Sequence, residues 1–460
     1  MTRLAAPLAR LVCAASVVLG AGCGDAADAT GQDTSDAGAS GSETDATGPD
    51  SSGSVAPTEA VTSAPPDSDG GSGSHGQDSS SSGAGTSTTG EPPAPACGDG
   101  QLDPGEGCDD GDDDAFDGCL PDCTAVEPID APPLQWQYFE VPGTMCMNGQ
   151  PAGFGISLNP DSKDVMIYLE GGGACFNDAC DFSAFNIPFI PPPDGIFNRN
   201  NPGNPVRDWS MIYVPYCTGD IHGGDRDTML GGQVRHFRGY TNITKYLQQW
   251  VPTFADAERV LLTGISAGGF GAGLNAAQVA DAFGPGPQMI VIDDSGPPLS
   301  NSVIPPCLQQ TFREVWGLDQ TILAACGPDC TDPDDFATEI LAHTLSAYPD
   351  IRFGLFSNTA DAIIRAFMSF GWGNGQYDTC DGLPLIVPAE VYEDGLLALR
   401  ADHEDAAATY YIGQTQVLYN FGQGHTVLRS PTFWTTVIDG VQLAEWVGQV
   451  IDGEVHHVGP

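Results

Sequence analysis

The stretch Val260-Leu-Leu-Thr-Gly-Ile-Ser266-Ala-Gly-Gly269 decides the fold of this chain of 460 residues. An apolar run ends in Gly264-Ile-Ser266-Ala-Gly268, and a pattern of small and apolar residues typical of a helix follows over 268–282. A strand, a sharp turn and a helix form the context in which the G-x-S-x-G pattern holds a serine on a strained turn. The stretch therefore predicts a serine hydroxyl that projects above a parallel sheet. The alternative is a glycine-rich turn with an idle serine.

A serine hydroxyl is a weak nucleophile unless a base and an orienting acid accompany it. In α/β-hydrolases these groups follow the serine in the order acid, then histidine. Five of the eight histidines follow Ser266, and we expect His425 to be the base, because it ends a glycine-containing loop after a strand-like run at 415–421. For the acid we expect Asp361, which follows the apolar run 351–356. Asp294 is the alternative acid, although it lies one strand too early.

A glycine loop supports the same site. The apolar run 165–169 predicts a buried strand, and Glu170-Gly-Gly-Gly-Ala-Cys175 follows it directly. Glycines after a strand let backbone N–H groups approach an oxyanion, as in the HGGG-type loops of esterases. Together with the residue after the serine, this loop predicts three oxyanion donors, the N–H groups of Gly173, Ala174 and Ala267.

From about residue 132 to 450 the chain resembles the pectin acetylesterase/Notum family of serine carboxylesterases. The matching segments are Tyr168–Cys175, Val214–Asp220, Gly264–Gly269 and Asp294–Gly296, with looser matches at Asn358–Asp361 and His425. The resemblance implies an α/β-hydrolase fold, no cofactor and a Ser266–Asp361–His425 triad. The chain has Ala174 and Thr426 where the family usually has Trp and often Cys, so the acyl-chain preference of the family does not carry over.

The N-terminus predicts export. Two arginines precede an apolar run at 11–19 and a Gly-Cys23 step, which is typical of a signal peptide over 1–22 with Cys23 lipidated. Ordinary secretion is the alternative. Residues 24–96 are rich in Ser, Thr, Gly and Asp and hold too little apolar surface to fold. We expect a disordered tether whose r.m.s. reach is about 45–50 Å, and a lipid anchor as the only membrane contact of an outer-membrane or cell-surface protein.

Residues 97–127 resemble the acidic, cysteine-rich repeat of myxobacterial surface proteins. Four cysteines in an exported segment predict two disulfides, and three pairings are open. The spacing of Asp110, Asp112 and Asp114 suits the hard oxygen ligands of Ca²⁺, and a solvated acidic knob is the alternative.

The chain beyond residue 127 holds eight more cysteines, an even number that suits four disulfides. Cys175 with Cys180, and Cys326 with Cys330, have the close spacing of zinc ligands. No histidine lies close in sequence to either pair, and an oxidising compartment favours disulfides, so we expect no metal site there.

The formal net charge is −46, and residues 128–460 carry 38 acids against 13 Lys and Arg, a net charge of −25. So acidic a surface repels nucleic acid and anionic polymers. One basic cluster stands out: Arg226, Arg235, His236 and Arg238. A neutral acetylated sugar or a small ester therefore fits at least as well as pectin, unless Ca²⁺ bridges polymer and protein.

The order of elements predicts one domain over 128–460, a mainly parallel doubly wound sheet with a disulfide-braced cap inserted at 297–350. We expect strands near 153–158, 165–169, 211–215, 260–263, 289–293, 351–356 and 415–420. Helices are expected near 240–250, 268–282, 335–347 and 430–450. The aromatic residues Phe367, Phe370, Trp372 and Tyr377 line the acyl pocket or pack within the cap.

The function that these patterns favour is a monomeric, exported serine carboxylesterase that hydrolyses acyl esters, acetyl esters first, of small molecules or polysaccharides. Two alternatives stay open. One is an esterase that delipidates proteins, or a peptidase. The other is a non-catalytic surface binding protein that keeps a hydrolase shell.

Overall fold

The computed structural model describes residues 97–178, 191–332, 334–372, 380, 385–413 and 424–460. The predicted signal peptide, Cys23 and the tether over 24–96 lie outside the described residues. So does the strand expected at 415–420.

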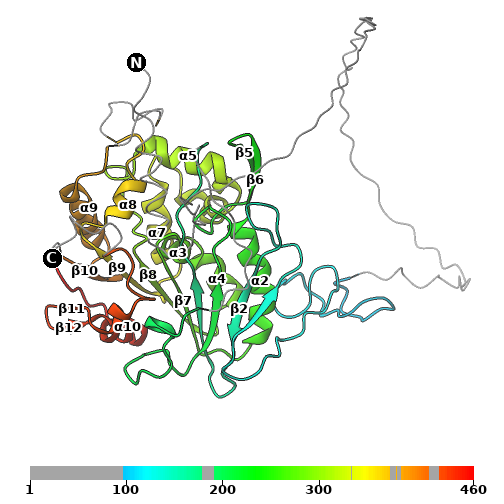
Figure 1. Cartoon of the computed structure of the whole chain (residues 1–460). Helices are drawn as coiled ribbons and strands as arrows, with labels where there is room; N and C mark the ends of the chain where they lie inside the picture. Colours follow the sequence, from blue (N-terminus) through cyan, green and yellow to red (C-terminus); the bar gives the residue numbers. More distant parts are fainter. Residues whose placement is uncertain (1–96, 179–190, 333, 373–379, 381–384, 414–423) are drawn as a thin grey trace, which may run out of the picture. The chain divides into compact units, whose positions relative to one another are not determined.

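The centre of the fold is a sheet of eight strands in the order β1-β2-β4-β3-β7-β8-β9-β10 (Figure 1). The strands β1 and β2 pair antiparallel, as do β2 and β4, and the six strands from β4 to β10 in that order are parallel. The bounds are β1 Gln137–Glu140, β2 Gly153–Ser157, β3 Asp164–Leu169, β4 Ser210–Val214, β7 Arg259–Ile265, β8 Gln288–Asp294, β9 Arg352–Asn358 and β10 Ala407–Ile412. The predicted α/β fold with a mainly parallel sheet is confirmed.

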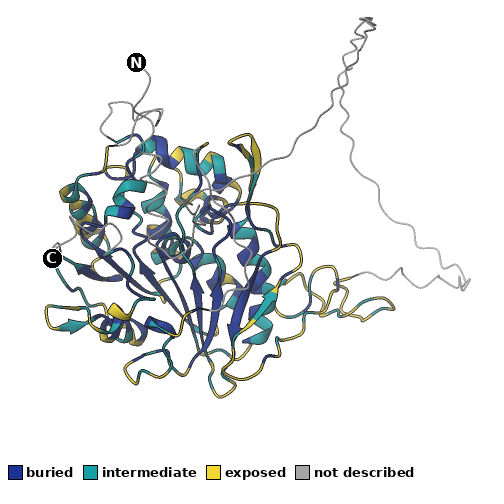
Figure 2. Ribbon diagram, in the orientation of Figure 1, coloured by how far each residue is buried: buried dark blue, intermediate teal, exposed yellow. Residues whose placement is uncertain are grey.

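Both faces of the sheet are covered, as Figure 2 shows by the dark central strands. Side chains alternate between faces along a strand. Val165, Ile167 and Leu169 of β3 point into one apolar cluster, and Met166 and Tyr168 into the other. The first cluster includes residues of α2 (Gly239–Thr253), α4 (Ala276–Phe283), α5 (Pro306–Trp316), α7 (Phe336–Ala347) and α9 (Ala389–Asp402). The second includes residues of α10 (Leu443–Asp452). Burial on both faces explains why the inner strands have nearly continuous apolar sequences.

Two expected helices differ from the structure. The helix expected at 268–282 is two helices, α3 (Ala267–Leu274) and α4, separated at Asn275. The side-chain amide of Asn275 donates to the carbonyl oxygens of His222 and Gly271. Such hydrogen bonds from a side chain to the backbone compete with those of a regular helix, and the two helices meet at this residue. The helix expected at 430–450 was wrong in its first half. That half is a 3₁₀ turn, Pro431–Trp434, and a hairpin of β11 (Val437–Ile438) and β12 (Val441–Gln442) that turns through Asp439 and Gly440, both with positive φ.

The segment at 297–350 contains α5, α6 (Ile322–Cys326) and α7, with short 3₁₀ turns at Leu318–Gln320 and Gly327–Asp329. Disulfides join Cys307 to Cys380 and Cys326 to Cys330. The first ties α5 to the chain that follows α8 (Ala362–Phe367). The expected bracing of this segment by disulfides is thus present. A third disulfide, Cys146–Cys217, joins the loops before β2 and after β4, and Cys175 is also disulfide-bonded.

The cysteine-rich segment has the pairings Cys97–Cys123 and Cys108–Cys119. Its carboxylates mostly accept hydrogen bonds from nearby backbone N–H groups, as Asp114 does from Phe116. Ligand oxygens of Asp110, Asp112 and Asp117 lie within 4.8 Å of one another at exposed positions, and Asp114 is not in that group. Exposed acidic groups commonly lie this close without a metal, so the arrangement assigns none. The disulfides in both parts of the chain fit an exported protein. Across the described residues, every helix is too short or too polar to span a bilayer.

Candidate active site

Ser266 occupies the strained turn between β7 and α3. Its backbone has φ 53° and ψ −119°, a conformation that costs a non-glycine residue about 1–3 kcal/mol and is often kept at functional sites. A Cβ on Gly264 would lie 2.2 Å from the carbonyl oxygen of Gly268, and one on Gly268 would lie 2.0 Å from that of Leu169. Only glycine fits at these two positions, so the G-x-S-x-G pattern is a steric requirement of the turn.

Asp361 and His425 form a buried pair. The Asp361 Oδ2 lies 2.7 Å from the His425 Nδ1, and the two side chains are 0% and 3% exposed. Asp361 follows β9 and caps α8, and its Oδ1 accepts the N–H groups of Ile363 and Ile364 at 2.9 and 3.0 Å. One carboxylate oxygen is therefore fixed by the helix N-terminus, and the other is left for the imidazole.

The second ring nitrogen of His425 is poised to accept a proton. Its Nδ1 donates to Asp361, so in the neutral ring Nε2 carries the lone pair. Nε2 is buried and has no hydrogen-bond partner among the described residues. Burial lowers the pKa of His425, but the charge and hydrogen bond of Asp361 and the charge of Asp294 outweigh it and raise that pKa above its usual value. The ring is thus a stronger base than an isolated imidazole.

Asp294 links the serine to the histidine loop. Its carbonyl oxygen accepts the N–H of Ser266 at 2.8 Å, and its carboxylate Oδ2 accepts the N–H groups of Val427 and Leu428 at 2.7 Å each. Burial raises the pKa of Asp294 to about 6, against the lowering effect of these N–H donors. The hydrogen bond from the imidazole goes to Asp361, so Asp294 positions the backbone on both sides of the site and is not the histidine's partner.

A pocket lies beside the serine and all three predicted oxyanion donors. Ser266, Gly173, Ala174 and Ala267 share its wall. None of these three N–H groups donates a hydrogen bond within the described part of the chain. The rest of the wall is apolar: Ile221, Phe270, Ile304, Leu308, Phe312, Trp316, Ile364, Phe367 and Met368. The pocket can hold a carbonyl group with an apolar substituent.

Of the four aromatic residues expected to line the acyl pocket or to pack within the cap, one lines the pocket. Phe367 lines the pocket. Phe370 packs against Phe176, with ring centroids 4.9 Å apart, and neither Phe370 nor Trp372 is part of the pocket wall. Tyr377 lies outside the described residues.

A half-buried ion pair joins the glycine loop to the histidine loop, and sequence reasoning missed it. The Glu170 Oε2 accepts the Tyr213 hydroxyl at 2.7 Å and pairs with the Arg429 guanidinium. The backbone oxygen of Glu170 accepts the Nε2–H of His222, which burial keeps neutral by lowering its pKa to about 4. Glu170 stands in the glycine motif, but the sequence gives no direct sign of its partner. The available clue was Arg429, which is one of only 13 Lys and Arg residues after residue 127 and lies four residues beyond His425.

Over part of its length, the chain is similar to known proteins. Residues 136–343 match the model of the Pectinacetylesterase family. Ser266 and the glycine loop lie within the matched residues, and Asp361 and His425 lie beyond them.

Among curated proteins, the chain is 30% identical over 149 residues to the palmitoleoyl-protein carboxylesterase NOTUM of Homo sapiens, covering 30% of each chain. It is 28% identical over 201 residues to notum1' of Xenopus laevis, another palmitoleoyl-protein carboxylesterase, covering 40% of this chain and 38% of that protein. It is 24% identical over 251 residues to Pectin acetylesterase 4 of Arabidopsis thaliana, covering 48% and 60%. The matched region is therefore less than two thirds of each of these relatives.

Proposed function

We propose that residues 128–460 form a serine carboxylesterase that hydrolyses acyl esters, with acetyl esters of neutral sugars and small alcohols as its first substrates. The observation that carries this is the buried Asp361–His425 pair, whose Nε2 has no partner in the described residues. His425 lies just before the residues Val427 and Leu428, whose N–H groups bind Asp294. The carbonyl oxygen of Asp294 also accepts the N–H of Ser266. The esterase names of the relatives agree with it.

The reaction is a two-step acyl transfer. The Ser266 Oγ attacks the ester carbonyl carbon as the His425 Nε2 takes the hydroxyl proton, and the carbonyl oxygen becomes an oxyanion. The N–H groups of Gly173, Ala174 and Ala267 receive that charge, each donor contributing about 3–4 kcal/mol to the transition state. His425 returns the proton to the alcohol as the ester C–O bond breaks.

Deacylation repeats these steps with water. His425 takes a proton from the water that attacks the acyl-enzyme, then gives it to the Ser266 oxygen as the carboxylic acid leaves. Asp361 keeps the imidazole in the tautomer with its proton on Nδ1 and stabilises its charged form.

The charge of the protein favours neutral substrates. Two members of the basic cluster are paired: the Arg238 Nη2 lies 2.5 Å from the Asp227 Oδ1, and the His236 Nδ1 lies 2.8 Å from the same oxygen. These pairs leave little positive potential for a polyanion in a domain of net charge −25.

A second candidate is removal of a long acyl chain from a protein. The apolar wall of the pocket beside Ser266 favours it, since that wall suits an alkyl chain as well as an acetyl methyl group. Rates on acetyl and long-chain acyl esters of one leaving group would distinguish the two candidates.

The test of the proposed function is turnover of p-nitrophenyl acetate and of an acetylated neutral sugar by the full chain and by Ser266→Ala. We expect Ser266→Ala to keep its thermal unfolding transition and to lose activity to the level of the blank. Ser295→Ala is the matched control, because Ser295 is also buried with positive φ after a strand, but its hydroxyl donates to Asp294. We expect it to keep at least a tenth of the activity. Retained turnover in pure Ser266→Ala protein would show that the assignment is wrong.

We also propose that Cys23 is lipidated and that residues 24–96 tether the enzyme to a membrane surface. The supporting observations are the sequence pattern at the N-terminus and the disulfides of the described residues. Cell fractionation tests it: the full chain should sediment with membranes, and Cys23→Ala should be recovered in the soluble fraction. A full chain that is soluble after export would contradict it.

A further inference from the structure

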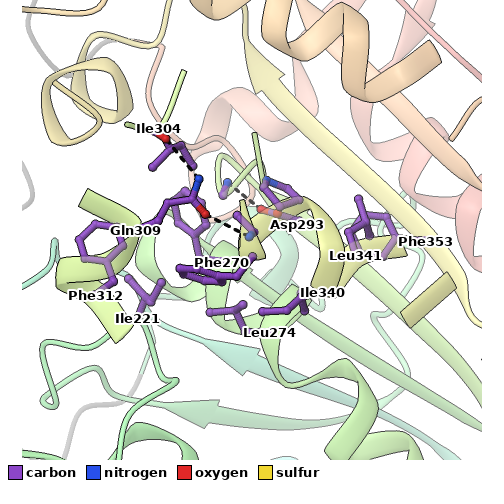
Figure 3. Close-up of a pocket in the computed structure, with 15 residues that line it drawn as sticks. Ile221, Phe270, Leu274, Asp293, Ile304, Gln309, Phe312, Ile340, Leu341 and Phe353 are labelled. Carbon is purple, nitrogen blue, oxygen red and sulfur yellow. Dashed lines mark hydrogen bonds between the residues drawn. The ribbon is translucent and has the colours of Figure 1, made fainter. Parts of the chain in front are cut away.

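A second pocket lies behind the wall of the first. Its lining residues come from α3, α5, α7, β8, β9 and the neighbouring loops. Figure 3 shows their side chains. Four residues line both pockets: Ile221, Phe270, Ile304 and Phe312. The two pockets are therefore neighbouring compartments with a common wall, and only the first contains Ser266.

The second compartment offers a ligand mainly apolar side chains. Its far wall consists of Leu274, Phe336, Ile340, Leu341 and Phe353, among other residues. The polar side chains that reach it are used within the protein. Asp293 accepts the N–H of Gly296 at 2.7 Å, and burial raises its pKa well above the usual value, which favours the neutral acid. Gln309 donates to the carbonyl oxygen of Ile304 at 3.2 Å and accepts the N–H of Ala337 at 3.3 Å.

Phe270 is the shared residue closest in sequence to Ser266. It lies on α3, and its N–H donates to the carbonyl oxygen of Ser266 at 3.0 Å. In Figure 3 its ring lies between Ile221 and Phe312 on one side and Ile340 and Leu341 on the other. A ring attached one helical turn after the nucleophile is well placed to limit how far an acyl chain extends from the serine.

We propose that the second compartment is the distal part of the acyl-binding site, and that Phe270 sets the acyl-chain length by separating it from the part beside Ser266. The occupant is the far end of the acyl chain of an ester whose carbonyl group lies at Ser266. The continuity of the two apolar walls carries this inference, which rests on the proposed esterase function.

The test compares kcat/KM for p-nitrophenyl esters of two to twelve acyl carbons. Each methylene that enters an apolar compartment contributes roughly fourfold in affinity. Phe270→Ala opens the wall, so its ratio of kcat/KM for the ten-carbon ester to that for the two-carbon ester should rise at least tenfold over the unmodified chain. Alanine is the best helix former, so the helix α3 tolerates this change. Phe270→Leu should give a smaller rise in the same direction and serves if Phe270→Ala does not fold.

Two further variants test whether the gain comes from the second compartment. Ala337→Phe places a ring in the far compartment, so in the Phe270→Ala background it should return the ratio to the unmodified value. Phe283→Ala is the matched control, because Phe283 is a half-buried phenylalanine that lines neither pocket, and its ratio should not change.

A fluorophosphonate probe on each variant separates the two possible failures. A folded, probe-labelled Phe270→Ala or Phe270→Leu protein with an unchanged ratio would overturn the role of Phe270 and leave the esterase standing. A gain that persists with Ala337→Phe would overturn the assignment of the distal compartment. An unmodified chain that neither labels nor hydrolyses any ester would instead reject the proposed function itself.

Discussion

At the scale of single residues, the proposed chemistry depends on the different partners of the two carboxylate oxygens of Asp361. Oδ1 caps α8 and Oδ2 accepts the His425 Nδ1–H, so one side chain holds a helix and sets a tautomer. An asparagine at this position can keep the cap, but its amide nitrogen would face Nδ1 and force the ring proton onto Nε2. The base would then be lost without loss of the fold.

Asp361→Asn should therefore lower kcat for ester hydrolysis by about 10⁴-fold. Its thermal unfolding temperature should stay near that of the unmodified chain. Asp350→Asn, on an exposed loop, is the control and should leave kcat unchanged. Steady-state kinetics and thermal melts of the three proteins check this, and an Asp361→Asn enzyme within tenfold of full activity would contradict it.

The pH dependence of activity belongs to His425. Only the neutral ring can take the serine proton, so kcat/KM should fall as the pH drops through the pKa of His425. Because Asp361 and Asp294 raise that pKa, the fall should be centred above 6.5, the ordinary value for histidine. In Asp361→Asn the centre of the fall in residual activity should move to lower pH. Rate profiles between pH 4 and 9 measure both values, and an unmoved centre would argue against the pairing.

The sequence predicts a turn at Ser266 because its motif states a steric requirement: Gly264 and Gly268 occupy positions that accept nothing larger. For the base, chain order leaves five histidines, and the glycine-containing loop before His425 is the reason to choose it, so its catalytic role stays a prediction. The structural partners were harder to predict. Asp294 and the Glu170–Arg429 pair act through contacts between residues more than 130 positions apart, which no local pattern encodes.

At the scale of elements, α5 is the helix of the cap segment 297–350 that contributes side chains to the pocket beside Ser266. Leu308, Phe312 and Trp316 of this helix line the pocket beside Ser266, and Cys307 at its start is bonded to Cys380. The disulfide closes a loop with a sequence separation of 73 residues, against 4 for Cys326–Cys330.

The two disulfides should contribute unequally to stability. Loop-closure entropy gives about 4 kcal/mol for the longer loop and about 2 kcal/mol for the shorter one. Replacing Cys307 and Cys380 together by alanine should lower the unfolding temperature more than replacing Cys326 and Cys330, and should also lower esterase activity. Calorimetry and activity assays of the two double variants test this. An equal or reversed order would show that α5 is held by packing alone.

Element-level prediction succeeded for buried strands and failed where local patterns were weak or broken. The strands β3, β7 and β8 are nearly continuous apolar runs, because side chains on both faces of an inner strand are covered. The strand β10 was not predicted, and the strand expected nearby at 415–420 lies outside the described residues. In the last helix, Pro431 and the turn at Asp439–Gly440 interrupt a pattern that looks helical over a longer span.

At the scale of the whole molecule, net charge is the reason for the proposed preference for neutral substrates. Both the hydrolase part and a pectin backbone are polyanions, so their encounter is repulsive at low salt, and screening shortens that repulsion to about 10 Å at 0.1 M salt. Neutral esters carry no such penalty.

Raising NaCl from 10 to 300 mM should therefore increase kcat/KM severalfold on acetylated polygalacturonate and leave it unchanged on triacetin. A chelator in both assays removes Ca²⁺ that could bridge polymer and protein. Acetate release measures both rates. A polygalacturonate rate that is high at 10 mM NaCl and insensitive to salt would contradict the preference for neutral substrates.

The most direct test of Ser266 as the nucleophile is covalent labelling of the purified full chain with a fluorophosphonate, followed by peptide mass spectrometry. We expect one adduct, on Ser266, that is absent from Ser266→Ala and strongly reduced in Asp361→Asn. A correctly disulfide-bonded chain that forms no adduct, or forms it on another residue, would contradict Ser266 as the activated nucleophile.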